Sequence, residues 1–188
     1  MLSGKGEFRL NTANKLTIGR VALIPVFLVV LYVDFPGGNY AAMALFILAG
    51  LTDVADGYIA RNRGQVTDFG KFTDPLADKI LVVSAMLWFV EKGVIPAWAA
   101  LIVIIREFMV TALRLIAVGN GRVIDAAISG KIKTVVTMVC LTAMFLDLRR
   151  WMVFVCIGAI TATTLASGVE YYVKNRDVFR FKSGHSFK

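Results

Sequence analysis

The chain has 188 residues, of which 57% are hydrophobic and 18% charged, and its mean hydropathy is +0.70. This balance is too apolar for a water-soluble globular domain and predicts an integral membrane protein. The net charge of +8 does not indicate nucleic-acid binding, because the basic residues are spread along the chain without a recognisable reading module.

Six helices that cross the membrane are expected, provided that each apolar stretch continues as a helix through its charged neighbours. In chain order they cover residues 15–34, 40–61, 71–90, 95–118, 131–148 and 151–173. Turn-forming residues separate them, as in 34–39 (DFPGGN) and 119–121 (GNG). The sequence therefore predicts an all-α integral membrane protein, built as a bundle of six transmembrane helices.

Three parts of the chain are distinguished by composition. Residues 1–14 are mostly polar, which suits either a short interfacial helix or a disordered arm. Residues 15–173 are expected to form one membrane domain. Residues 174–188 form a basic tail, whose positive charge suits anionic membrane lipids.

Charged residues fall at the starts of expected helices one, three and five and at the ends of helices two, four and six. All of these ends lie on one side of the membrane, because successive helices run in opposite directions. That side carries eighteen of the 21 Lys and Arg residues, and the other carries Lys92, Arg149 and Arg150. The positive-inside bias predicts a multi-pass protein of the cell membrane with both termini in the cytoplasm. Ionisable groups deep within the helices predict a polar cavity open to the cytoplasm.

Four aspartates lie at helical spacing around one expected turn. Asp53 and Asp56 are three residues apart, and Asp74 and Asp78 are four apart, so each pair shares a helix face. Four carboxylates in an apolar setting repel one another unless cations lie between them. Oxygen ligands without Cys or His favour two hard divalent ions, Mg²⁺ or Mn²⁺.

Two other interpretations of the aspartates stay open at this point. The first is a structural ion network with Arg61, Lys71 and Lys79. The second is a divalent-cation channel or transporter. The apolar outer halves of the expected helices argue against the second, because they leave no polar path across the membrane.

The spacing Asp53-x2-Asp56-Gly57-x2-Ala60-Arg61-x8-Gly70-x3-Asp74-x3-Asp78 resembles the signature of the CDP-alcohol phosphatidyltransferases, a family of integral membrane enzymes. All eight fixed positions are present within 26 residues, which makes the motif specific. The chain length and the six-helix plan also resemble that family. The resemblance therefore covers nearly the whole chain.

This resemblance implies transfer of a phosphatidyl group from CDP-diacylglycerol to an alcohol, with release of CMP. It implies two metal ions, bound by Asp53, Asp56, Asp74 and Asp78. Asp78 would also act as the general base. A homodimer is implied as well.

The resemblance further implies a binding site for the CDP donor. Small residues leave room for the nucleotide, although helix packing alone also explains them. Near the first helix, a helix cap and a basic side chain that reaches the lipid headgroups explain Asn14, Thr17 and Arg20 nearly as well. The donor-binding candidates are Gly57, Ala60, Arg61, Gly70, Asn14, Thr17 and Arg20.

Segments 14–20 (NKLTIGR) and 104–134 are similar to the phosphatidylglycerophosphate synthase branch of that family, whose acceptor is glycerol 3-phosphate. Basic residues near the cytoplasmic ends of helices four and five would bind the acceptor phosphate, unless they reach out to lipid headgroups instead. The nearest alternative is a sister transferase that uses inositol phosphate or another polyol. The acceptor-binding candidates are Arg106, Arg114, Lys131 and Lys133.

Overall fold

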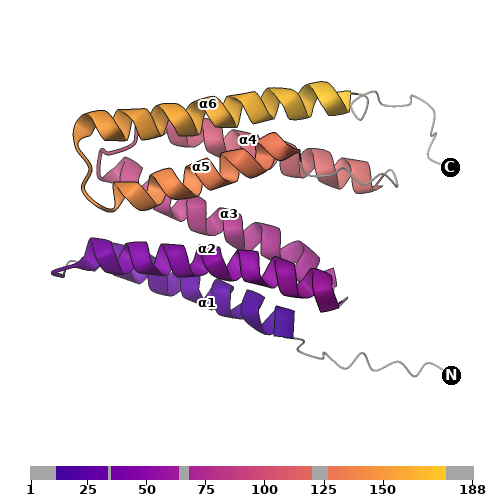
Figure 1. Cartoon of the computed structure of the whole chain (residues 1–188), viewed down its shortest axis with the longest axis horizontal. Coiled ribbons are helices and arrows are strands. Elements are labelled where there is room, and N and C mark those ends of the chain that lie inside the picture. The colour runs from indigo at the N-terminus through magenta and orange to yellow at the C-terminus, as the bar shows by residue number, and fades with distance from the viewer. Residues whose placement is uncertain (1–11, 34, 64–67, 120–126, 177–188) are drawn as a thin grey trace, which may run out of the picture. The chain divides into compact units, whose positions relative to one another are not determined.

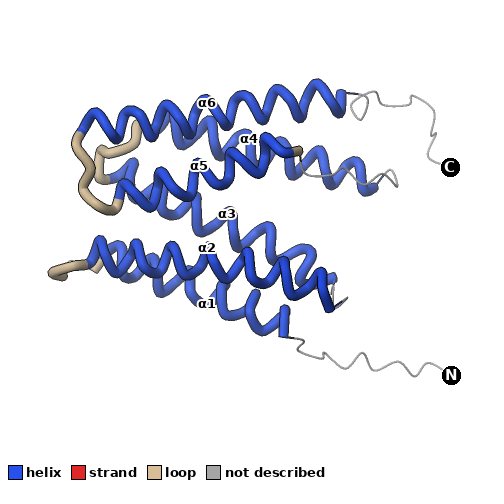
Figure 2. Tube along the Cα trace, viewed as in Figure 1, coloured by secondary structure: helices blue, strands red, loops and turns tan. Residues whose placement is uncertain are grey.

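The computed structural model of the chain describes residues 12–33, 35–63, 68–119 and 127–176. Within these ranges the structure describes the backbone alone for residues 12–18, 20–21, 53–63, 68–78 and 118–119. The described residues form helices and no strand (Figures 1 and 2). The helices are α1 (Thr12–Tyr32), α2 (Gly38–Arg63), α3 (Asp68–Glu91), α4 (Ala97–Gly119), α5 (Ile128–Met144) and α6 (Arg150–Asn175). The all-α prediction is confirmed for this part of the chain.

All six expected helices are present, but some of their ends differ from the prediction. α1 begins at Thr12, three residues before the expected start, so Asn14 lies inside the helix rather than in the arm. α5 ends at Met144 instead of residue 148. The backbone N–H of Leu146 bonds to Ala143 O at 3.0 Å, and Asp147 has a left-handed φ of 48°. This tight turn ends the helix although the following residues are apolar.

The chain forms two compact units, and the boundary between them falls within α3, between Ser84 and Ala85. In the first unit, α1 and α2 pack side by side as a helical hairpin (Figure 1). Gly37, with φ of +86°, supplies the left-handed turn between them. Residues three or four apart face the partner helix and are buried: Ile24, Phe27 and Leu31 of α1, and Ala42, Phe46 and Ala49 of α2.

In the second unit, α6 packs against both α4 and α5. An aromatic cluster forms where α3 ends and α5 turns toward α6. Phe145 lies 4.8 Å from Phe89 and 5.8 Å from Trp88, measured between ring centroids. These contacts anchor one end of α5, while the polar residues described below lie toward its other end.

One stretch of the described residues is long and apolar enough to cross a membrane by itself: the 25 residues Arg150–Lys174 of α6. Ala22–Tyr32 and Gly38–Thr52 form shorter apolar helical stretches. Many large apolar side chains are exposed, including Phe154 and Val169, each 63% accessible. An exposed apolar surface of this kind suits contact with lipid.

Candidate functional site

The four aspartates of the sequence motif lie within helices. α2 is helical through Asp53 and Asp56, and α3 through Asp74 and Asp78, so the spacings of three and four residues occur within regular helices. Their side chains lie outside the described part of the structure. Among the side chains that are described, no group of three or more His, Cys, Asp or Glu residues lies together. The metal ligands therefore remain predictions.

The predicted donor-binding residues also fall outside the described side chains. Their backbone is helical throughout, in α1, α2 and α3. Their contacts with a nucleotide therefore stay predicted, for Asn14, Thr17, Arg20, Gly57, Ala60, Arg61 and Gly70.

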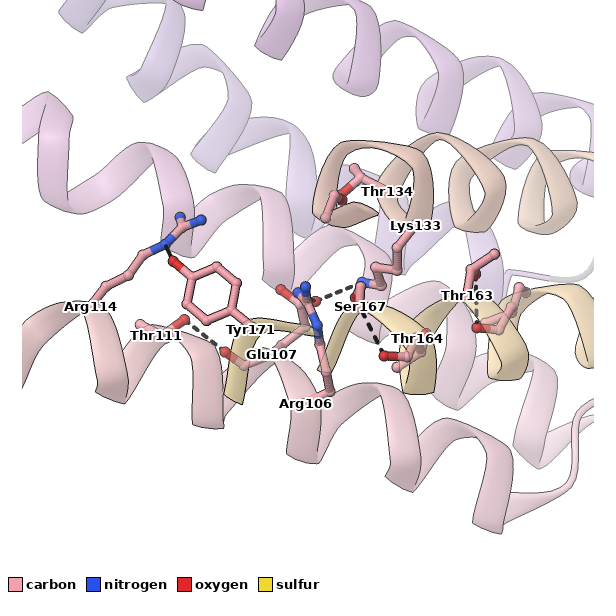
Figure 3. A network of polar contacts seen from close by, with 12 residues as sticks. Arg106, Glu107, Thr111, Arg114, Lys133, Thr134, Thr163, Thr164, Ser167 and Tyr171 are labelled. Atoms are coloured by element: carbon pink, nitrogen blue, oxygen red, sulfur yellow. Dashed lines mark hydrogen bonds and ion pairs between the residues drawn. The ribbon is translucent and has the colours of Figure 1, made fainter. Parts of the chain in front are cut away.

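Three of the four acceptor-binding candidates, Arg106, Arg114 and Lys133, make polar contacts between α4, α5 and α6 (Figure 3). Lys133 of α5 is only 4% exposed. Its Nζ donates to Glu107 Oε1 of α4 at 2.6 Å, and Arg106 Nη1 donates to the same oxygen at 2.9 Å. One carboxylate thus binds two of the predicted acceptor-binding cations.

Glu107 is absent from the residues predicted to form the site. A signal for it existed, because a carboxylate among the apolar residues of an expected membrane helix requires a partner. The sequence alone does not predict which residue is that partner, because Lys133 is 26 residues away in the chain. Only the packing of α4 and α5 against α6 brings the two side chains together.

The Arg106 side chain lies between two glycines of neighbouring helices. A Cβ built on Gly130 of α5 would lie 3.5 Å from Arg106 Nη2, and one built on Gly168 of α6 would lie 3.4 Å from its Cγ. The side chain is only 12% exposed. Arg106 and Lys133 are therefore held inside the unit, and neither extends outward as a basic residue bound to lipid headgroups would.

Arg114 lies two turns after Arg106 on α4 and has a different partner. Its Nε donates to the hydroxyl of Tyr171 of α6 at 2.7 Å, and its guanidinium carbon lies 5.5 Å from the centre of the Tyr171 ring. Tyr171 is 2% exposed. Sequence reasoning missed this residue, because a tyrosine near the end of an apolar helix is common at a membrane surface.

Lys131 does not join the network. Two residues before Lys133 on the same helix, it is turned by roughly 200° from that residue and is exposed. Within the described part of the chain its side chain makes no hydrogen bond or ion pair. The four basic candidates thus differ in environment: Arg106 and Lys133 share a carboxylate, Arg114 binds a phenol, and Lys131 is solvated or lipid-facing.

The model of the family described as CDP-alcohol phosphatidyltransferase matches residues 10–166, a range that includes the four aspartates and the basic candidates of α4 and α5. The chain belongs to the CDP-alcohol phosphatidyltransferase family. The match ends before Tyr171, so the residue that binds Arg114 lies outside the matched range.

Proteins of this family from several bacteria are similar to the chain over most of its length. A Bacillus subtilis (strain 168) protein named CDP-diacylglycerol–glycerol-3-phosphate 3-phosphatidyltransferase is 37% identical, with 90% of this chain and 97% of that protein aligned. A Wigglesworthia glossinidia brevipalpis protein with the same name is 31% identical, over 92% and 99% of the two chains. A Mycobacterium tuberculosis (strain CDC 1551 / Oshkosh) protein named probable phosphatidylglycerophosphate synthase is 38% identical, over 87% and 81%.

Proposed function

We propose that this phosphatidyltransferase moves the phosphatidyl group of CDP-diacylglycerol to glycerol 3-phosphate, which yields phosphatidylglycerol phosphate and CMP. One observation carries the choice of substrates: the near full-length similarity to the Bacillus and Wigglesworthia proteins, whose names contain both. The eight-residue motif of α2 and α3 supports the donor. The basic network of α4 and α5 supports a phosphorylated acceptor.

The family implies two divalent metal ions, and the chemistry of the available ligands fits them. Asp53, Asp56, Asp74 and Asp78 supply hard oxygen ligands within helical segments, which favours Mg²⁺ or Mn²⁺. When bound, such ions would neutralise charge on the donor pyrophosphate and on the departing CMP. The rival ion network with Arg61, Lys71 and Lys79 would require no metal, so metal dependence distinguishes the two.

The chain's own residues perform the remaining tasks. Asp78 would accept the proton of the acceptor hydroxyl while the hydroxyl oxygen attacks the phosphorus of the phosphatidyl group. The new P–O bond forms as the bond to the CMP oxygen breaks, and CMP leaves. The donor would be bound by residues of the first three helices, namely Asn14, Thr17, Arg20, Gly57, Ala60, Arg61 and Gly70.

The acceptor phosphate would be bound by the basic side chains of α4 and α5. Arg106, Lys133 and Glu107 together carry one net positive charge, so their cluster can accept a further anion. Arg114 would add a guanidinium fork. Lys131, which is exposed, would attract the acceptor from a distance rather than hold it.

The proposed membrane arrangement follows the charge pattern. Residues 15–173 would form a six-span domain in the cell membrane, with both termini and the reaction on the cytoplasmic side. Residues 1–14 would be an interfacial arm and residues 174–188 a basic tail against lipid. The donor's acyl chains would stay among the membrane lipids, and two chains would pair as a homodimer.

An acceptor panel tests the function. Purified protein in Mg²⁺ and CDP-diacylglycerol is given radiolabelled glycerol 3-phosphate, inositol phosphate or glycerol, and both CMP and labelled lipid are measured. Lipid product with glycerol 3-phosphate alone is expected. Product with inositol phosphate instead would support the sister transferase, and Mg²⁺ flux into liposomes without CMP release would support a transporter.

A further inference from the structure

We infer that Tyr171 is a positioning residue for acceptor binding, which holds the Arg114 guanidinium so that its terminal nitrogens face the acceptor phosphate. The inference rests on the proposed function, since the phosphate is that of the proposed acceptor. Its basis is one contact between α4 and α6. Arg114 Nε donates to the Tyr171 hydroxyl at 2.7 Å, across 57 residues of sequence.

The tyrosine is a rigid partner for the arginine. Its side chain is 2% exposed and belongs to a buried cluster with Val110 and Leu113, which lie on the same helix as Arg114. A ring buried in this way cannot follow a moving arginine. The guanidinium also lies 5.5 Å from the ring centre, where attraction to the aromatic face adds to the hydrogen bond. Both contacts restrict a side chain that is otherwise flexible.

The contact leaves the phosphate-binding part of Arg114 available. Only Nε is engaged by the Tyr171 hydroxyl. Among the described residues, the two terminal nitrogens make no hydrogen bond, and Figure 3 shows them directed away from the ring. A guanidinium binds phosphate best through a pair of parallel N–H groups. Fixing the guanidinium beforehand reduces the entropy lost when the phosphate binds.

Tyr171→Phe tests the inference, because it removes the hydroxyl and keeps the buried ring. The KM for glycerol 3-phosphate should rise about tenfold, as expected for a lost hydrogen bond to a charged group. The kcat and the KM for CDP-diacylglycerol should stay within about twofold, because neither depends on that bond. Tyr40→Phe is the matched control. It removes an exposed tyrosine hydroxyl near the start of α2 and should leave all constants unchanged.

A double-mutant cycle with Arg114→Ala separates positioning from packing. If Tyr171 acts through Arg114, Tyr171→Phe should cause no further rise in KM once Arg114 is absent. An additive effect, an unchanged KM in Tyr171→Phe, or an equal rise in KM for both substrates would overturn the inference. Wild-type protein that turns over CDP-diacylglycerol but not glycerol 3-phosphate would instead overturn the proposed function, before any variant is measured.

Discussion

Gly168 of α6 lies directly against the aliphatic part of Arg106 of α4, since a Cβ at residue 168 would come within 3.4 Å of Arg106 Cγ. Gly130 of α5 lies near the guanidinium of the same side chain. Small residues at these two positions let the backbones of α5 and α6 approach an arginine that would otherwise need a wider gap. The space that Gly130 and Gly168 leave positions Arg106 beside Glu107, the carboxylate that Arg106 shares with Lys133.

A large side chain at residue 168 should therefore destabilise the protein. Gly168→Leu would displace Arg106 and cost about 1–3 kcal/mol, as overpacking usually does. Gly158→Leu on the same helix is the control, because a Cβ there meets nothing within 4 Å. Thermal unfolding in detergent compares the two. Gly168→Ala should be tolerated. Equal losses of stability in the two leucine variants would show that the space around residue 168 is not tightly packed.

The shared carboxylate predicts an order of stability among charge variants. Glu107→Gln leaves Arg106 and Lys133 buried without their common anion, and breaking such a cluster costs on the order of 3–5 kcal/mol. Lys133→Met should cost less, because Glu107 keeps Arg106 as a partner. Urea or thermal unfolding of both variants tests this order. The reverse order would mean that Glu107 is not the centre of the cluster.

The two proposed roles of the aspartates should separate in kinetics. Asp78→Asn should lower kcat by at least about 100-fold, because it removes the proton acceptor, while binding of CDP-diacylglycerol is largely kept. Asp56→Asn should weaken donor binding and raise the Mg²⁺ concentration needed for half-maximal rate. CMP release at varied Mg²⁺, together with a donor-binding assay, measures both. Full activity in either variant would disprove its role.

Removing the divalent ion should stop the reaction. Excess EDTA should abolish CMP release, and added Mg²⁺ or Mn²⁺ should restore it, because the carboxylates are proposed to act through these ions. The measurement is the rate of CMP release before and after chelation. Unchanged turnover in EDTA would favour the metal-free ion network of the aspartates with neighbouring basic residues.

Arg114→Ala should act mainly on the acceptor. The KM for glycerol 3-phosphate should rise by roughly 10- to 100-fold, with little change in the KM for CDP-diacylglycerol. Arg114→Lys should recover the activity only partly, because lysine lacks the planar fork. Arg150→Ala, at an exposed arginine at the start of α6, is the control. An unchanged KM in Arg114→Ala would assign Arg114 a structural role.

Sequence reasoning found the helices because their signals are local. Apolar stretches, turn residues and a motif of fixed spacing all lie within short segments of chain. It failed at the end of α5, where Phe145 and Leu146 continue the apolar pattern. Burial of Phe145 against Trp88 and Phe89 accompanies the turn there, and those partners lie more than fifty residues earlier in the chain.

The amino-acid sequence by itself determined the apolar character, the six helices, the aspartate motif and the four basic candidates. Only the tertiary structure decided that Lys133 is buried on Glu107 while Lys131, two residues away, is exposed. It also decided that Tyr171 binds Arg114. The physical reason is that a helix face acquires its environment from helices distant in sequence, and no local pattern encodes which distant side chain will be there.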